Sequence, residues 1–183
     1  MQATSTFPFH FHFYTYCLDA DGLKYIIVSH SQYNLVTNDM QSKDNYFIPV
    51  DQPITDIPSD VINLFICGYD QLFDQSIFLH SFSKLQTIVI GSNCFNHVRE
   101  FVIDGLASLE SVKIGEYSLG MDGEERDDGV CRITNCPNLR QLEIGDDSFW
   151  DFKSFELSNV NSLQSIYFGN SCFYYADFSL KGE

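Results

Sequence analysis

Basic residues, prolines and tryptophan are all scarce in this chain. Its 183 residues include 10 Lys and Arg against 25 Asp and Glu, together with five prolines and one tryptophan. The formal net charge of −15 repels nucleic-acid phosphates and anionic membrane surfaces, so we expect neither as a partner. Five prolines are too few for a proline-rich linker. The hydrophobic content of 44% is enough to build a core, and the length suits one domain.

Long apolar runs are also missing. No stretch approaches the ~18–20 residues that a membrane-spanning helix needs. The N-terminus, MQATSTFPFHFHFYTYCL, has no Lys or Arg before its apolar stretch, whereas a secretory signal begins with a basic region. Phe alternates there with His and Tyr, which is typical of a strand. We therefore expect a chain with no membrane span that is not secreted by the usual route.

A short apolar pattern ending in glycine recurs in the C-terminal two-thirds of the chain. Four copies are LQTIVIG, LESVKIG, LRQLEIG and LQSIYFG, and a weaker copy, INLFICG, precedes them. The four copies are spaced by 24, 30 and 24 residues, counted from their leucines or from their glycines. These residues are Leu85, Leu109, Leu139 and Leu163, with Gly91, Gly115, Gly145 and Gly169. A second apolar segment follows each copy, through Leu79, Ile103, Ile133, Leu157 and Leu180.

Strand geometry explains this repeat. Side chains alternate between the two faces of a strand, so Ile88 and Ile90 point one way and Val89 points the other. The glycine ends the strand where the chain turns sharply, and we expect it to supply a positive φ. A unit of about 24 residues cannot bury its apolar face alone, but stacked units form a continuous core. The alternative, a β-sandwich with coincidentally spaced glycines, does not explain four matched columns.

The unit L-x-x-I-x-I-G-x-x-S/C-F, followed by a second apolar strand and N-x-L or S-x-L, resembles leucine-rich repeats. It is most similar to the BspA-like type of unicellular eukaryotes and bacteria, over about residues 61–183. A glycine column replaces the Asn column of the usual L-x-x-L-x-L-x-x-N repeat, which puts the Asn ladder of that family in question. The resemblance implies a protein-binding scaffold without catalysis of its own.

We therefore predict a mainly β fold: a leucine-rich-repeat-like solenoid of about five ~24-residue coils with parallel strands, capped by an N-terminal β-hairpin. Residues 1–50 form the cap, because strand-like segments flank the turn sequence DADG. Residues 51–183 form the repeat solenoid, with an acidic loop insertion at 120–129. The carboxylate spacing there does not match a calcium loop, so we expect a solvated loop, with adventitious cation binding as the alternative. The chain stops partway through a unit, which favours a fragment of a longer solenoid over an end that meets another chain.

Five of the six cysteines occupy repeat columns that otherwise hold small or apolar residues. Cys94 and Cys172 share a column with serines, and Cys131 shares one with Phe101. Cys136 falls in the column of Leu106 and Val160, and Cys67 in that of Ile90. We expect reduced thiols that pack as small hydrophobic groups, which indicates a reducing, cytoplasmic compartment. A bridge between Cys131 and Cys136 stays possible from their spacing alone.

No metal, cofactor or catalytic site is expected. Cys131-x₄-Cys136 stands alone as a zinc signal, and His10-x-His12 lacks a third ligand, so solvent-facing histidines are favoured. No nucleophile elbow, P-loop or H-E-x-x-H motif is present. A β-helix glycosidase would need two converging carboxylates, and the candidates Glu143 and Glu156 belong to different strands of the coil. We therefore do not expect an enzyme.

Two outward columns are the candidate binding surfaces. The first-strand column holds Ile66, Val89, Lys113, Glu143 and Tyr167. The second-strand column holds Phe78, Val102, Arg132, Glu156 and Ser179. Each could be ordinary sheet surface with modest ion pairs, Lys113 to Glu143 and Arg132 to Glu156. We prefer the first column, because leucine-rich repeats bind through that face. The expected function is a non-enzymatic scaffold for a protein partner, and the alternative is a structural segment of a larger receptor, adhesin or kinase.

Overall fold

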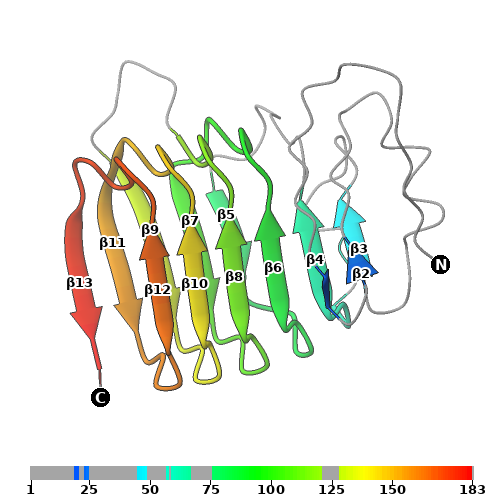
Figure 1. Cartoon of the computed structure of the whole chain (residues 1–183). Coiled ribbons are helices and arrows are strands. Elements are labelled where there is room, and N and C mark those ends of the chain that lie inside the picture. Colours follow the sequence, from blue (N-terminus) through cyan, green and yellow to red (C-terminus); the bar gives the residue numbers. More distant parts are fainter. Residues whose placement is uncertain are drawn as a thin grey trace, which may run out of the picture.

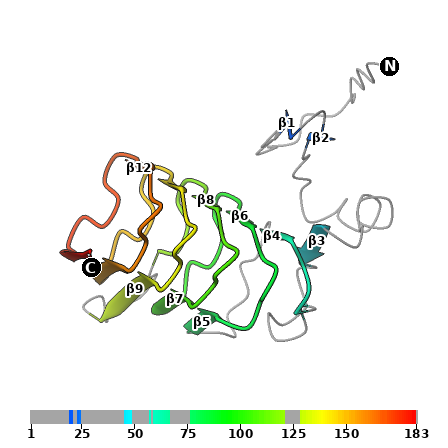
Figure 2. The same ribbon diagram turned by 90° about the horizontal axis from the view of Figure 1, so that it is seen from below.

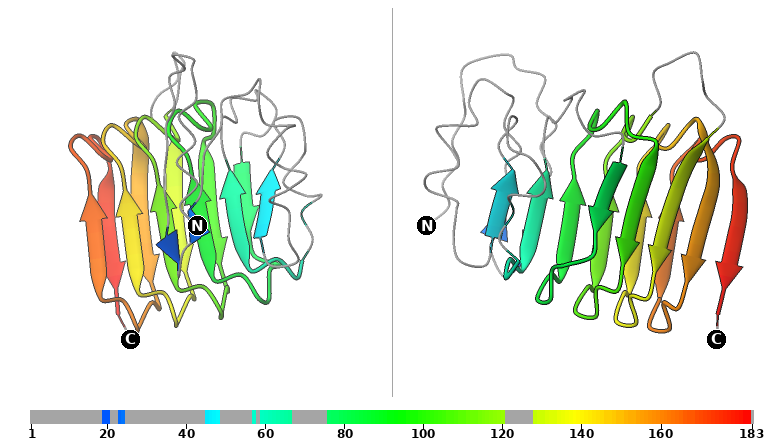
Figure 3. Two further views of the ribbon diagram at one scale, coloured as in Figure 1. Left: turned by 45° about the vertical axis from the view of Figure 1, so that its right-hand side comes forward. Right: turned by 180° about the vertical axis from the view of Figure 1, so that it is seen from behind.

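The chain forms a parallel β-solenoid of about four turns of about 24 residues. The computed structural model describes residues 19–20, 23–24, 45–48, 57, 59–66, 76–120 and 128–182. Each coil contributes one strand to each of two facing sheets, whose strands run in opposite directions (Figures 1 and 3). Viewed from below, the coils are successive loops joining the two sheets (Figure 2).

The first sheet has six strands and the second has five, and all the pairs in both are parallel. The first consists of β3 (Asn45–Ile48), β4 (Asn63–Ile66), β6 (Thr87–Ile90), β8 (Ser111–Ile114), β10 (Gln141–Ile144) and β12 (Ser165–Phe168). The second consists of β5 (Ser76–Leu79), β7 (Glu100–Asp104), β9 (Gly129–Thr134), β11 (Phe152–Ser158) and β13 (Asp177–Lys181). About five coils were expected. The turns from β4 to β12 number four, and β12 and β13 continue the same winding.

Only part of the predicted N-terminal cap can be compared with the structure. Two short strands, β1 (Asp19–Ala20) and β2 (Leu23–Lys24), pair antiparallel across the DADG turn sequence. The remaining residues of the predicted hairpin, with His10 and His12, lie outside the described residues. Strand β3 falls within the predicted cap but pairs in parallel with β4, so the first sheet begins before residue 51.

The core lies between the two sheets and follows the predicted alternation. In β8 and β10 every second side chain is buried, and the leucines that open the repeats stand two residues before their strands. Leu85, Leu109 and Leu139 are fully buried, and Leu163 packs against the same core. Each opening leucine closes a tight turn, as where the Leu139 N–H donates to the Cys136 carbonyl at 3.1 Å. The coils therefore stack in register, as the spacing of the leucines predicts.

The corner after the first sheet corrects the role expected for the glycines. Positive φ occurs two and four residues after each glycine, as at Tyr117 (53°) and Leu119 (57°). Among the described glycines, only Gly105 has a positive φ. A Cβ on Gly145 would instead lie 2.7 Å from the backbone nitrogen of Glu116 in the preceding coil. The column is glycine because the stacked backbones approach closely there, not because φ is positive.

A ladder of serine hydroxyls crosses the same corner. Ser118 Oγ donates to the Gly91 carbonyl at 2.8 Å and accepts from the Cys94 N–H at 3.2 Å. Ser148 makes the equivalent bonds, 2.7 Å to the Gly115 carbonyl and 3.2 Å from the Ser118 N–H. These buried hydroxyls satisfy backbone groups that the turn leaves without a sheet partner. This requirement accounts for the small hydrogen-bonding residue, Ser or Cys, in this column.

The described cysteines are free thiols in the predicted columns. Cys94, Cys131, Cys136 and Cys172 form no disulfide, which excludes the bridge between Cys131 and Cys136. Burial raises the pKa of Cys131 well above its usual value and that of Cys136 to about 11. Both are therefore neutral, core-packed thiols at physiological pH. Cys67 lies outside the described residues.

The long coil keeps its register on both sides of the insertion. The Leu119 N–H donates to the Cys94 carbonyl, in step with the 24-residue spacing, whereas Val130 pairs with Glu100 at a spacing of 30. The six extra residues therefore lie between Leu119 and Val130, in agreement with the repeat spacing. Residues 121–127 lie outside the described residues, so neither prediction for the acidic loop is tested.

Candidate functional site

The outward column of the first sheet is present, with one correction of register. Lys113 pairs with Val89 on one side and with Glu143 on the other, and Glu143 pairs with Tyr167. Ile66, however, pairs with Ile90 and is fully buried in the core. The residue that aligns with Val89 is Phe65. The outward column is therefore Phe65, Val89, Lys113, Glu143 and Tyr167.

Exposure changes along this column. Phe65 and Val89 are each only 2% exposed, so the expectation of an exposed valine is wrong. Lys113 and Glu143 form the predicted ion pair, with 2.8 Å between Nζ and Oε2. Both are partly exposed, and such a pair stabilises a sheet by about 0.2–1 kcal/mol. Tyr167 is 56% exposed. The accessible part of the column consequently runs from Lys113 to Tyr167.

The side chains beside this accessible part are short and polar. Strand residues two positions apart share a face, so Ser111, Gln141 and Ser165 lie on the same outer face as Lys113, Glu143 and Tyr167. None of these three polar residues is buried. The face is thus flat and rich in hydroxyl and amide groups, has one balanced ion pair, and carries an exposed aromatic ring at the end nearest the C-terminus.

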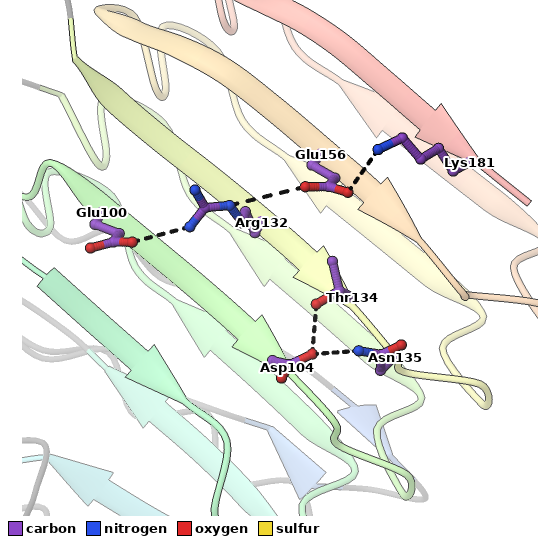
Figure 4. A network of polar contacts seen from close by, with 7 residues as sticks. All are labelled: Glu100, Asp104, Arg132, Thr134, Asn135, Glu156 and Lys181. Carbon is purple, nitrogen blue, oxygen red and sulfur yellow. Dashed lines mark hydrogen bonds and ion pairs between the residues drawn. The ribbon is translucent and has the colours of Figure 1, made fainter.

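The outer face of the second sheet carries a charge network across four strands (Figure 4). Arg132 on β9 lies 3.1 Å from Glu100 on β7 and 4.0 Å from Glu156 on β11. Lys181 on β13 lies 3.4 Å from Glu156. The predicted column from Phe78 to Ser179 is in the observed register. Every charge in this network faces an opposite one, which is what a stabilising sheet surface requires.

A polar corner borders this network and contains an Asn ladder (Figure 4). Thr134 Oγ1 donates to Asp104 Oδ1 at 2.6 Å, and Asn135 Nδ2 donates to the same oxygen at 2.8 Å. Asn159 Nδ2 continues the ladder to Asn135 Oδ1 at 2.7 Å. The two hydrogen bonds to Asp104 lower the pKa of its carboxyl. The ladder lies after the second strand, not after the first, where the leucine-rich-repeat pattern has its Asn.

An exposed aromatic group on the last two coils was missed by the sequence analysis. Trp150 stacks on Tyr174 with ring centroids 4.9 Å apart and planes 6° apart. Tyr175 contacts both rings edge-on, and Tyr174 and Tyr175 are largely exposed. The only signal in the sequence was an aromatic residue directly after the buried Phe149 and Phe173. Because that column holds no repeated residue type, periodicity could not identify it.

The chemistry available on these surfaces is that of ordinary side chains. Glu143 on β10 and Glu156 on β11 belong to opposite sheets, so the structure does not bring that carboxylate pair together. Within the described ranges, no group of three or more His, Cys, Asp or Glu side chains could hold a metal ion. Among the same residues, no helix is long and apolar enough to cross a membrane.

Comparison of the chain with protein-family models, with curated proteins and with solved structures finds no match. What can be inferred about its function therefore rests on the solenoid and its surfaces.

Proposed function

We propose that the chain is a non-enzymatic scaffold that binds a protein partner through the accessible outer face of the first sheet. The observation that carries this proposal is the flat face around Lys113, Glu143 and Tyr167. Tyr and Ser are residues that binding surfaces favour, because Tyr supplies contact area at low entropic cost and Ser supplies adaptable hydrogen bonds. The Lys113–Glu143 pair adds no net charge that a partner would have to neutralise.

The stacked coils support this function because they hold the face rigid. Each outward side chain projects from a strand that is paired on both sides, or on one side for β12. The leucines before the strands are anchored in the core, so the spacing of the outer face is set by the interior. A partner that binds such a surface loses little free energy in ordering it. The second sheet is less suited, because its outward charges are already paired with one another.

We further propose that the repeats are of the leucine-rich, BspA-like kind. The buried leucine column and the strand that follows each leucine support this assignment. The Asn ladder after the second strand, and the glycine column after the first, are the features in which the chain departs from the usual leucine-rich repeat.

The face is tested by comparing the proteins recovered by three forms of the chain. The face variant carries Lys113→Ala, Glu143→Ala and Tyr167→Ser. Val89 is left unchanged because it is buried. The matched control carries Arg132→Ala and Glu156→Ala on the second sheet, which likewise removes one ion pair. Quantitative mass spectrometry after affinity capture should find partners that the wild type and the control retain and the face variant loses.

Circular dichroism should first show that all three forms are folded. Purified candidate partners are then titrated against each form, since removal of one aromatic side chain from an interface weakens binding by roughly 5–30-fold. Equal affinity of wild type and face variant for every recovered protein would rule out this face.

A further inference from the structure

The last coil leaves its inward side chains uncovered. Ile166 on β12 is 42% exposed, and Phe178 and Leu180 on β13 are 50% and 65% exposed. Their counterparts one coil earlier, Leu142, Phe155 and Leu157, are at most 4% exposed. Figure 1 shows β12 and β13 as the outermost strands of their sheets. An apolar layer and two strand edges therefore face outward together at this end of the solenoid.

The sequence of β13 complements itself when it is reversed. The strand reads Asp177, Phe178, Ser179, Leu180 and Lys181. In an antiparallel pair centred on Ser179, Asp177 of one copy faces Lys181 of the other, and Phe178 faces Leu180. Opposite charges would then meet on the outer face, while the two apolar residues would meet on the core side. A parallel pair in the same register would instead place Asp177 opposite Asp177 and Lys181 opposite Lys181.

The charge of the last coil also permits two copies to approach. The whole chain carries a formal net charge of −15, which opposes self-association in general. Residues 159–182, however, contain only two charged side chains, Asp177 and Lys181, whose charges cancel. The end of the solenoid is thus a neutral, apolar surface on an otherwise strongly acidic molecule.

We propose that two copies of this chain associate end to end about a twofold axis, with β13 pairing antiparallel to β13 of the second copy. An axis perpendicular to both sheets also brings β12 beside its own copy in antiparallel orientation. Each sheet would then continue across the interface. The inward side chains of both last coils, including Phe178 and its neighbours Phe168 and Phe173, would form one shared layer. This interface is separate from the outer face that we propose for a protein partner.

Charge reversal tests the pairing, because the antiparallel register makes a specific prediction for mixtures. Asp177→Lys places Lys opposite Lys at both ends of the strand pair, and Lys181→Asp places Asp opposite Asp. Each variant alone should dimerise roughly tenfold or more weakly than the wild type. An equimolar mixture of the two should regain the dimer, because every pair across the interface is again Lys opposite Asp. Sedimentation velocity over a concentration series measures both effects.

Lys181 also lies near Glu156 within its own chain, so Lys181→Asp weakens an internal contact. Leu180→Asp avoids that problem, because it changes an exposed side chain that makes no ion pair. It should remove the dimer while leaving the circular dichroism spectrum of the monomer unchanged.

Cross-linking tests the position of the axis. Ser179 would lie opposite itself, and directly opposed residues of an antiparallel pair are close enough for a disulfide. Ser179→Cys should give a covalent dimer under mild oxidation. Val102→Cys, in the same outward column but on the interior strand β7, should not.

Three results would overturn the proposal. A wild-type chain that stays monomeric at high micromolar concentration would show that the charged ends of β13 simply protect an edge strand. A ladder of trimers and larger species would indicate head-to-tail stacking. Failure of the two charge variants to associate on mixing would exclude the antiparallel register. The Tyr167 face variant should dimerise like the wild type, so failure of the face proposal and failure of this one can be distinguished.

Discussion

At the scale of single residues, one repeat column can require a small side chain for quite different reasons. The column of Gly145 is restricted by the backbone of the preceding coil, whereas Gly105 has a positive φ and open space within 4 Å of the point where a Cβ would lie. The Ser118 column requires a hydrogen-bonding group as well as small size. These reasons predict different outcomes for substitutions that look alike in the sequence.

Gly145→Ala should destabilise the protein by about 1–3 kcal/mol, because the new methyl group would overlap the backbone of residues 115 and 116. Gly105→Asn is the matched control. Asn already occupies the same column with positive φ at Asn135 and Asn159, so this change should stay within about 0.5 kcal/mol of the wild type. Urea denaturation followed by circular dichroism measures both. Equal stability of the two variants would contradict the close-approach explanation.

Cys136 should make the protein less stable at high pH. Burial raises the pKa of its thiol from 9.0 to about 11, so the folded state holds the proton more tightly than the unfolded state. The resulting stabilisation is complete below pH 9 and is lost as the pH rises from 9 to 11. Cys136→Val places in this column the residue found at Val160. The free energy of unfolding of this variant should fall less steeply over that pH range, and an unchanged slope would count against the prediction.

At the scale of secondary-structure elements, the two corners of each coil are built differently. The corner after the first sheet uses serine hydroxyls and two residues of positive φ, whereas the corner after the second sheet uses Asp104, Asn135 and Asn159. Asn suits the second corner because it accepts positive φ and its amide also reaches the neighbouring coil. The two sheets are therefore kept in register by different polar ladders.

The Asp104 corner provides a prediction for acid pH. Asn135→Gly keeps the positive φ but removes a hydrogen bond to Asp104, so the pKa of the Asp104 carboxyl should rise towards 3.8. A lowered folded pKa stabilises the protein above the unfolded value and ceases to do so as the pH falls through the folded one. The destabilisation by Asn135→Gly should thus be largest above pH 4 and shrink at lower pH. Carbon-detected NMR titration of Asp104 follows the pKa directly, and Asn138→Gly, on the same coil but without contact to Asp104, is a suitable control.

The repeat spacing was sufficient to predict most of the fold. Strands, their parallel register, the buried leucines, the cysteine columns and both ion pairs across the sheets follow from a period of 24 residues and side-chain alternation. The error at Ile66 has a physical cause. Gly68 precedes Gly91 by 23 residues, whereas the strands there pair at a spacing of 24, with Leu64 and Ile66 facing the core. Counting back from the glycine therefore shifted the first copy by one residue.

Features that do not repeat could not be predicted in this way. The stacking of Trp150 on Tyr174 depends on two residues that occur in one column of two coils only. The burial of Val89 depends on the tertiary environment of its outer face, about which the alternation within a strand carries no information. The accessible part of the candidate surface was for the same reason smaller than the predicted column.

At the scale of the whole molecule, stability should decrease towards the last coil. Strands β8 and β9 are paired on both sides, whereas β12 and β13 are paired on one side and carry exposed apolar residues. In stacked repeats each coil is stabilised mainly by its neighbours, so the end coil should open first.

Hydrogen exchange tests this gradient. Amides of β13 should exchange roughly 100-fold or more faster than those of β9 in the Asp177→Lys variant, which is not expected to pair with a second copy. Uniform protection across both strands would indicate that the solenoid opens as a single unit. In the wild type, protection of β13 should increase with protein concentration, and that of β9 should not.

The position of Trp150 has a practical consequence for anyone who studies unfolding of this chain. It is the only tryptophan, and its indole ring rests on Tyr174 of the last coil. Intrinsic emission excited at the red edge of the indole band will therefore report the loosening of that coil before the rest of the solenoid melts. A fluorescence midpoint lower than the far-ultraviolet dichroism midpoint should be interpreted as local fraying and not as a populated global intermediate.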